Sequence, residues 1–381
     1  MSDLVSAEGD DSIAIRRSRF ETSPFLGFHT GPDAKFGVYA NRLFPLRGSC
    51  EAEYWNLRND AVLYDVPEKP LEIKGPDSLA LLERVICRPL ADLKQDRGRY
   101  AIACTHQGGM FMDGIVFKLA ADRYWYVQAD GDFETWLLAH SEAYNVEVND
   151  PCSWVLQIQG PASLSVLKAA TRNGVNETLG YFHAGLFSIG GQQVYVSRTG
   201  WTGEFGFEIY TRGNATDYPR LWQDLLSAGE RFGMVVGFGG SMDTRRIEAG
   251  ILNNGTDMDR TMTPFEAGLG AFVDFDNPGF VGREALLDAP REARLLGLIC
   301  ADVSPGQGWQ VFESDIPVGW IRTGDWSPTL KSGIAYVEFK QSSDWIGKSL
   351  ELRSHAGDSY TGQIVPLPFF DREKRIARGL V

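Results

Sequence analysis

The segment 197–210, SRTGWTGEFGFEIY, combines three glycines with acidic and aromatic side chains. Glycine allows tight turns and lets a flat ligand approach the backbone closely. The last residues alternate like a β-strand, so Glu208 and Tyr210, two positions apart, share one face. A carboxylate there complements a planar pair of N–H donors, such as a pterin edge, and Trp201 offers a stacking surface or an apolar wall. A hairpin whose glycines serve only the turns, with a solvated Glu208, fits this segment equally well.

Further motifs occur in a fixed order along nearly the whole chain. They are AVLYDV at 61–66, QGP at 159–161, RTGWTGEFGFEI at 198–209, RIEAG at 246–250, FVGREAL at 280–286 and SPTLKSGIA at 327–335. Their sequences and their order resemble those of the aminomethyltransferase (glycine cleavage T-protein) family of tetrahydrofolate-dependent enzymes. Each motif alone is weak, but their collinearity is specific.

The resemblance implies an α+β class with a three-lobed, aminomethyltransferase-like folate-binding fold that ends in a C-terminal β-barrel. Residues 1–288 would form the catalytic region from two intertwined α+β lobes, and residues 289–381 would form the barrel. The resemblance also implies an enzyme that transfers a one-carbon (methyl) group and uses tetrahydrofolate as its cofactor, bound in a central opening. The residues expected to bind the folate are Glu208, Trp201, Tyr210 and Trp125.

Within this family, four local features resemble the members that demethylate dimethylsulfoniopropionate. They are EYW at 53–55 before LYDV at 63–66, GGM at 108–110 before Asp113, YW at 124–125 running into AD at 129–130, and LPF at 367–369. The resemblance implies transfer of a methyl group from a sulfonium to N5 of tetrahydrofolate. It also implies a catalytic role for Asp113 and Tyr100, and a donor-binding role for Tyr54 and Trp55.

Two positions depart from the family pattern in ways that matter chemically. The family carries two adjacent acids after Gly-Gly-x-x, and Met112 stands at the first of them, the acid implicated in folate chemistry. A methionine cannot act as an acid, a base or a counter-ion, which argues against glycine cleavage. Transfer of an already activated methyl group requires mainly that the reactants be held close and in line. Met242 stands where the family has an arginine that engages the folate tail, so we expect the folate to be held differently here.

The donor determines what further chemistry the site must supply. A cationic sulfonium gains on the order of 0.5–2 kcal/mol over an aromatic face. Candidates for such a face are Tyr54, Trp55, Tyr100, Trp125 and Trp201. An aryl methyl ether of the vanillate or syringate type, acted on by O-demethylases of the family, instead needs a proton donor for its leaving phenolate. His29 and His106 are the groups to test, although a lone histidine is more often structural.

Two further alternatives are an aminomethyltransferase of glycine cleavage and a non-catalytic folate-binding accessory protein. Accessory members of the family carry a cysteine-containing signature where this chain reads PGFVGRE at 278–284, which weakens the accessory alternative. The segment 237–242, GFGGSM, lacks the last glycine of a dinucleotide-binding turn and does not open a βαβ unit, which argues against a nucleotide cofactor.

The composition agrees with a soluble enzyme and says little about which one. The chain of 381 residues has a formal net charge of −13, which argues against nucleic acid or an anionic membrane as a partner. Its five cysteines are isolated and show no C-x-x-C spacing, so we expect no disulfide framework and no metal site. Residues 1–19 lack the apolar run of a secretory signal, and no later segment is apolar enough to span a membrane, so we expect a cytoplasmic location. The expected partner is a small-molecule methyl donor, and the sequence is silent on oligomeric state.

The elements that must position these residues are mixed rather than regularly alternating. Helices are predicted over 77–85, with Asp77 as the cap, and over 218–232. Strands are predicted at 115–119, 125–128 and 154–157. From about residue 295 the chain is nearly all short strands, at 296–300, 317–322 and 333–339 and on both sides of 356–358. This run of strands predicts the C-terminal barrel.

Overall fold

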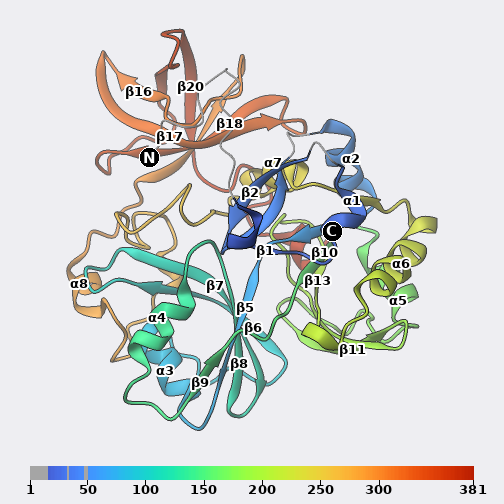
Figure 1. Ribbon diagram of the computed structural model, residues 1–381. Helices are drawn as coiled ribbons and strands as arrows, with labels where there is room; N and C mark the ends of the chain where they lie inside the picture. The colour runs from blue at the N-terminus through green and yellow to red at the C-terminus, as the bar shows by residue number, and fades with distance from the viewer. Residues whose placement is uncertain (1–15, 32–33, 47–49) are drawn as a thin grey trace.

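Three lobes are grouped around the centre of the molecule in the computed structural model, which describes residues 16–31, 34–46 and 50–381 (Figure 1). Two lobes are each built on one β-sheet with helices against it, and the third is a closed barrel. The mixture of sheets, helices and a C-terminal barrel is that of the predicted α+β class. The prediction made for residues 1–19 falls almost entirely outside the described residues.

The first sheet has six strands in the order β11-β12-β13-β10-β4-β14. Its strands are β4 (Val62–Val66), β10 (Val155–Gln159), β11 (Ala184–Ile189), β12 (Gln192–Ser197), β13 (Gly206–Tyr210) and β14 (Val235–Val236). Because side chains alternate along a strand, Leu156 and Ile158 of β10 share one face with Phe207 and Ile209 of β13, and this face is buried in the lobe's core.

Helices α5 (Ser163–Ala170) and α6 (Tyr218–Gly229) cover that core. The helix predicted over 218–232 is therefore present as α6 followed by a 3-10 turn, Glu230–Phe232. It ends at Gly233, whose φ of 70° is the left-handed conformation that glycine adopts without strain.

The second sheet has five strands in the order β6-β7-β8-β5-β9. Its strands are β5 (Lys69–Lys74), β6 (Arg97–Cys104), β7 (Met110–Ala120), β8 (Arg123–Gln128) and β9 (Glu147–Asn149). Helices α3 (Ser78–Val85) and α4 (Phe133–His140) pack on it. Asp77 is the N-cap residue of α3, as predicted, but its side chain makes no capping hydrogen bond and instead accepts the backbone N–H of Asn145, at 2.8 Å.

The barrel closes in the order β15-β18-β17-β16-β19-β20, with β20 paired to β15. Its strands are β15 (Leu295–Cys300), β16 (Gln310–Glu313), β17 (Ile316–Ser327), β18 (Ser332–Phe339), β19 (Ser349–Arg353) and β20 (Ser359–Val365). Closure leaves no unpaired strand edge. The prediction of a C-terminal barrel is confirmed.

Two connections bring the chain to the centre. Strands β4 and β5 belong to different sheets but are joined only by Pro67 and Glu68, so these two residues lie where the two lobes meet. A small sheet lies between the lobes and the barrel (Figure 1). Its strands β2 (Lys35–Tyr39) and β3 (Arg42–Leu46) form a hairpin, and β1 (Glu21–Thr22) pairs with β3.

Helix α7 (Gly240–Glu248) runs from the centre and contacts α2 (Glu51–Asn59) and the barrel strands β17 and β18. The remaining helices are α1 (Leu26–His29), α8 (Arg283–Asp288) and α9 (Arg375–Arg378), with 3-10 turns at Arg17–Arg19, Gly213–Ala215 and Gly270–Phe272. Within the described ranges, every helix is too short or too polar to cross a membrane.

Candidate functional site

A cavity of about 450 Å³ lies where the hairpin, the first sheet, α7 and the barrel meet. Its described lining residues are Tyr39, Phe44, Pro45, Leu46, Tyr64, Asp65, Val66, Pro67, Glu68, Trp201, Phe238, Gly239, Gly240, Met242, Asp243, Asn253, Gly324 and Asp325. Segments that are far apart in the sequence therefore build a single concave site, which is how small-molecule sites in proteins are commonly made.

The cavity wall is both aromatic and acidic. Its aromatic members are Tyr39, Phe44, Tyr64, Trp201 and Phe238, its acidic members are Asp65, Glu68, Asp243 and Asp325, and none of its described members is lysine, arginine or histidine. Three of the acids have partners: Asp65 contacts His29 at 3.1 Å, Asp243 pairs with Arg246 at 2.7 Å, and Asp325 accepts the Thr244 hydroxyl. Glu68 forms no ion pair with any residue in the described part of the chain.

Glu208 lies within a row of polar side chains that crosses the first sheet beside the cavity. Consecutive Cα partners in this row are Ser197, Glu208, Gln157 and Tyr64. Glu208 Oε2 accepts hydrogen bonds from the hydroxyls of Tyr210, at 2.6 Å, and Thr199, at 2.5 Å. Burial raises the pKa of the Glu208 carboxyl, and these hydrogen bonds oppose the shift because they stabilise the ionised form.

Gln157 connects Glu208 to Glu68. Its Nε2 donates to Glu208 Oε1 and to Glu68 Oε1, each at 3.0 Å. Glu68 Oε2 and Gln157 Oε1, the side-chain amide oxygen, are shielded from solvent. Neither accepts a hydrogen bond from the described residues. The backbone oxygen of Glu68 accepts from Arg42 at 2.7 Å, which fixes the residue in place. Burial and the neighbouring Glu208 carboxylate raise the pKa of Glu68 from its ordinary value of 4.5 to about 8.

Asp113 and Tyr100, the predicted catalytic residues, are hydrogen-bonded to each other across β7 and β6. The Tyr100 hydroxyl donates to Asp113 Oδ2 at 2.9 Å, and Oδ1 is buried with no partner among the described residues. Burial raises the pKa of Asp113 to about 6. Burial and the charges of Glu68 and Asp113 raise the pKa of Tyr39, so the Tyr39 phenol lies within electrostatic reach of both acids.

The four residues predicted to bind folate fall in two places. Trp201 lies in the cavity wall, and Glu208 and Tyr210 belong to the adjoining polar row. Trp125 lies between the two sheets, where its ring centroid is 6.0 Å from that of Tyr210 and its Nε1 donates to Glu72 at 2.9 Å. Trp125 is not among the described lining residues, and its folate-binding role stays a prediction.

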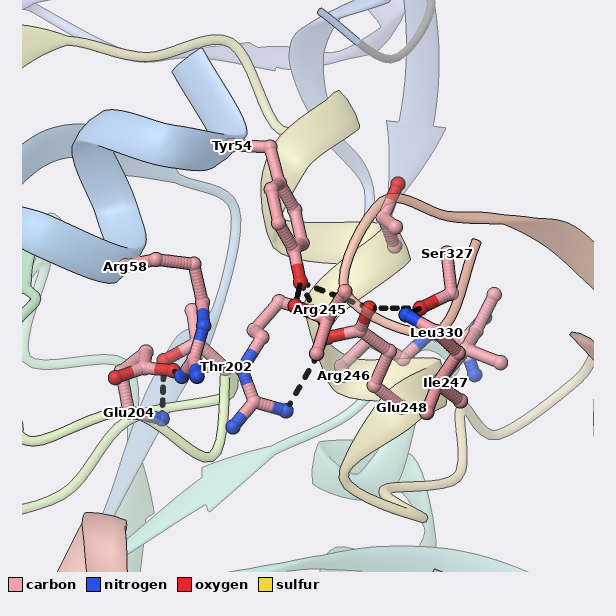
Figure 2. Close-up of polar contacts among 12 residues, drawn as sticks. Tyr54, Arg58, Thr202, Glu204, Arg245, Arg246, Ile247, Glu248, Ser327 and Leu330 are labelled. Carbon is pink, nitrogen blue, oxygen red and sulfur yellow. Dashed lines mark hydrogen bonds and ion pairs between the residues drawn. The ribbon is translucent and has the colours of Figure 1, made fainter. Parts of the chain in front are cut away.

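The two residues predicted to bind the donor also lie away from the cavity wall. The Tyr54 hydroxyl is buried and donates to both carboxylate oxygens of Glu248, at 2.8 and 2.9 Å (Figure 2). Trp55 is 39% exposed and donates to Glu51 on the same helix. Neither residue is among the described lining residues, so their donor-binding role also stays a prediction.

Tyr54 belongs to a buried network of paired charges, which we call the Arg245 network (Tyr54, Arg58, Glu204, Arg245, Glu248 and Ser327; Figure 2). Arg245 pairs with Glu204 at 2.6 Å and with Glu248 at 3.6 Å, and Arg58 also pairs with Glu204. Ser327 of the barrel donates to Glu248 at 2.5 Å. The network thereby joins the glycine-rich segment, α7, α2 and the barrel.

The two methionines that depart from the family pattern occupy different surroundings. Met112 packs in the core of the second lobe, whereas the adjacent Asp113 lies on the opposite side of β7. Met242 lies in the cavity wall and is 5% exposed. Two histidines were considered as acids. His29 contacts Asp65, a residue of the cavity wall. His106 stacks on the ring of His140 and is not among the described residues that line this cavity.

Comparison with known proteins identifies the family. Residues 34–277 match the GCVT N-terminal domain, and residues 294–371 match the glycine cleavage T-protein C-terminal barrel domain. The chain belongs to the aminomethyltransferase (glycine cleavage T-protein) family. Aminomethyltransferase from Moorella thermoacetica is 32% identical over 365 residues, which cover 93% of this chain and 98% of that protein. Aminomethyltransferase from Caldanaerobacter subterraneus subsp. tengcongensis is 30% identical over 358 residues, which cover 91% and 94%.

A crystal structure of glycine cleavage system aminomethyltransferase T from Bartonella henselae has the same fold, with a TM-score of 0.82, 24% identity and coverage of 93% of this chain and 99% of that one. The comparisons confirm the predicted family, the three-lobed fold with its C-terminal barrel, and an enzyme of one-carbon transfer that uses tetrahydrofolate. These relatives are named aminomethyltransferases, so the closer relation to dimethylsulfoniopropionate demethylases stays a prediction.

Sequence reasoning missed Glu68, Gln157 and Tyr39 as site residues. A signal existed for Gln157, because a glutamine inside the strand VLQIQ is a polar residue at a position that is usually apolar and must find hydrogen-bond partners. Nothing in the sequence marks Glu68 or Tyr39, whose importance depends on the crossing from β4 to β5 and on the position of the hairpin.

Proposed function

We propose that the protein transfers a one-carbon group from a small cationic donor to N5 of tetrahydrofolate, with donor and folate meeting at the central cavity. The observation that carries this proposal is the wall of the cavity, where acids and aromatic rings stand together and no described member is basic. Carboxylates attract a cation by charge, and aromatic faces attract it through the ring quadrupole.

The groups beside the cavity fit a reduced pterin. Its edge offers several N–H donors, and the buried oxygens Gln157 Oε1 and Asp113 Oδ1 are acceptors with no partner among the described residues. Glu208 adds a carboxylate whose Oε1 accepts only the Gln157 amide. Paired hydrogen bonds to such a carboxylate are strong and directional. Glu208 and Gln157 would therefore hold the pterin edge, and Trp201 would form an adjoining wall.

When bound, the folate supplies the nucleophilic nitrogen, and the chain's own residues hold the reactants and accept a proton. Methyl transfer from a sulfonium breaks a C–S bond, whose electrons stay on sulfur, and forms the N5–C bond. The N5 proton must then leave. Asp113, with a pKa of about 6 and a hydrogen bond from Tyr100, is a suitable weak base for it near neutral pH.

Two donor classes share the positive centre that the cavity favours. Dimethylsulfoniopropionate is the donor predicted from the sequence, and an amine donor is favoured by the relatives, which are named aminomethyltransferases. An aryl methyl ether carries no positive charge and needs an acid for its leaving group. His29, the histidine nearest the cavity, already contacts Asp65. An aryl ether is therefore the least supported donor.

The test is one-carbon transfer to tetrahydrofolate with dimethylsulfoniopropionate, dimethylglycine, vanillate and syringate in parallel, followed by mass spectrometry. We expect product from a cationic donor and none from either aryl ether. All four donors carry methyl groups, so direct transfer gives 5-methyltetrahydrofolate, which the mass of the product identifies; methylene-folate would require a two-electron oxidant that the assay does not contain. Product from an aryl ether alone would overturn the proposal, and folate binding without product from any donor would favour the accessory role.

A further inference from the structure

Of the acids in the described cavity wall, Glu68 and Asp325 form no ion pair, and only Glu68 has a buried carboxylate oxygen with no described hydrogen-bond donor. Asp243 has the Arg246 guanidinium, Asp65 has His29, and Asp325 has a hydroxyl donor. Glu68 Oε1 receives a hydrogen bond from the neutral Gln157 amide, its own backbone N–H also favours the ionised form, and its Oε2 has no described donor. An ionised carboxylate at a cavity wall without a counter-charge is unfavourable, because a buried charge needs a cation beside it or a proton on it.

The groups that face Glu68 do not supply that counter-charge. Glu208 from β13 shares the Gln157 amide with it, and Asp65 from β4 adds a second negative neighbour. Tyr39 from the hairpin is a neutral phenol whose own pKa Glu68 raises. Arg42 from β3 favours the ionised form, but its nitrogens bind Glu21 and the backbone oxygens of Glu68 and Ser153 rather than the Glu68 carboxylate.

We propose that Glu68 is the residue that recognises the positive charge of the one-carbon donor, with the donor cation replacing the proton on Glu68, which passes to solvent. The charge balance is simple: a neutral carboxyl and a free cation become a carboxylate beside a bound cation, and one proton is released. This proposal rests on the proposed function and names the residue that selects its class of substrate.

The pKa of Glu68, raised to about 8 by burial and Glu208, sets how this exchange depends on pH. Below about pH 8 the free protein holds the proton, so binding must release it and donor affinity rises with pH by up to about tenfold per unit. Above that pH the carboxylate is already ionised, and affinity no longer depends on pH. Folate binding through Glu208 does not require this release.

The test is calorimetric titration of the whole protein with tetramethylammonium and with dimethylsulfoniopropionate, in buffers of different ionisation enthalpy. The control without a positive centre is 4-methylpentanoate, which keeps the carboxylate of dimethylsulfoniopropionate and has carbon in place of the sulfonium sulfur. We expect release of about one proton for each cation bound near neutral pH and none with 4-methylpentanoate. Equal binding of dimethylsulfoniopropionate and 4-methylpentanoate to the wild-type protein, without proton release, would overturn the proposal.

The variant Glu68→Gln keeps the shape of the side chain and removes its charge. We expect it to abolish proton release and weaken cation binding by about tenfold or more, with 4-methylpentanoate unaffected. The matched control is Glu338→Gln, because Glu338 is a buried glutamate of the barrel that pairs with Arg294 and Arg322. In this variant Arg294 still pairs with Glu266, and Arg322 still pairs with Asp259. This control should bind cations and release protons like the wild type.

The outcomes separate this proposal from the proposed function. Cation binding with proton release that Glu68→Gln abolishes, in a protein with no transfer activity, would uphold the role of Glu68 and reject the function. Normal transfer with an unchanged donor affinity in Glu68→Gln would reject the role of Glu68, as would a variant that weakens folate binding alone. If the variant does not fold, the comparison of dimethylsulfoniopropionate with 4-methylpentanoate, which lacks the positive centre, on the wild-type protein still decides.

Discussion

Two buried clusters of this protein each contain a pair of glutamates, and they differ in how the charge is balanced. In the Arg245 network, Glu204 and Glu248 are matched by Arg58 and Arg245 (Figure 2). Beside the cavity, Glu68 and Glu208 share only the neutral amide of Gln157 and the hydroxyls around it. Glu204, Glu248 and Glu208 are all buried, so burial of a glutamate alone does not identify a functional site.

The difference in charge balance separates a structural cluster from a ligand-binding one. Paired charges balance each other and hold four elements together. Beside the cavity, burial raises the pKa of both acids, the Glu208 carboxylate raises that of Glu68 further, and oxygen acceptors stay available to a ligand. Perturbed carboxyls that face a concave site are typical of functional sites. Substitutions in the two clusters should therefore have different effects on stability and on ligand binding.

The largest effect is expected from Arg245→Met, which breaks the balanced network. Removal of the guanidinium leaves Glu248 without an arginine partner and Glu204 with Arg58 alone, so we expect a loss of about 3–5 kcal/mol in the free energy of unfolding. Urea denaturation followed by circular dichroism measures it. Glu68→Gln is the comparison, because it removes an unmatched charge and should cost far less. A loss below about 1 kcal/mol for Arg245→Met would mean that the network does not stabilise the fold.

The next effect concerns the cavity side, where Glu208→Ala should weaken tetrahydrofolate binding by on the order of 100-fold. The estimate corresponds to the loss of a pair of charge-assisted hydrogen bonds to the pterin edge. Binding is measured by fluorescence titration, and thermal unfolding checks that the variant is folded. Undiminished affinity in a folded Glu208→Ala protein would remove Glu208 from the folate site.

The unmatched acids also predict how stability depends on pH. The folded-state pKa of Glu68, about 8, lies above its ordinary value of 4.5, so its contribution to stability is complete below that ordinary value and is lost as the pH rises through about 8. We therefore expect the melting temperature to fall between about pH 5 and pH 8, and to fall less steeply in Glu68→Gln. Asp113 and Glu208, whose pKa values are also raised, keep part of the slope. Parallel curves for the two proteins would contradict the raised pKa of Glu68.

The smallest effect is expected from Trp125→Phe, which tests a residue predicted from the sequence to bind folate. The substitution removes the hydrogen bond to Glu72 and keeps an aromatic ring between the sheets, so we expect a loss of about 1 kcal/mol in stability and less than about twofold in folate affinity. Denaturation and folate titration of one preparation measure both. A tenfold loss of folate affinity at unchanged stability would show that Trp125 contacts the folate.

Local patterns predicted the features of this protein that depend on nearby residues. The alternation in β13 correctly put Glu208 and Tyr210 on one face, since the Tyr210 hydroxyl donates to the Glu208 carboxylate. The run of short strands after residue 295 correctly predicted the barrel, because each strand shows its own alternation and turn residues.

The features that sequence reasoning missed depend on contacts between distant segments. Glu68 matters because two consecutive strands enter different sheets, which no local pattern encodes. The donor-binding role of Tyr54 stays a prediction, and no local pattern indicates that its hydroxyl meets Glu248, nearly two hundred positions later in the chain. Asp77 lies at the predicted N-cap position of α3, but its carboxylate binds the backbone of Asn145. In each case a distant partner decides what the side chain does.

The alternation of β10 and β13 divides the first sheet between two tasks. Leu156 and Ile209 point into the core of the lobe, whereas Gln157 and Glu208 point to the opposite face. A shift of register would turn the apolar side chains out of the core, so packing fixes the spacing between the polar groups. Glu68, in the connection between two strands, is under no such constraint. The residue at position 68, which we propose contacts the donor, can therefore change during evolution without disturbing the packing of β10 and β13.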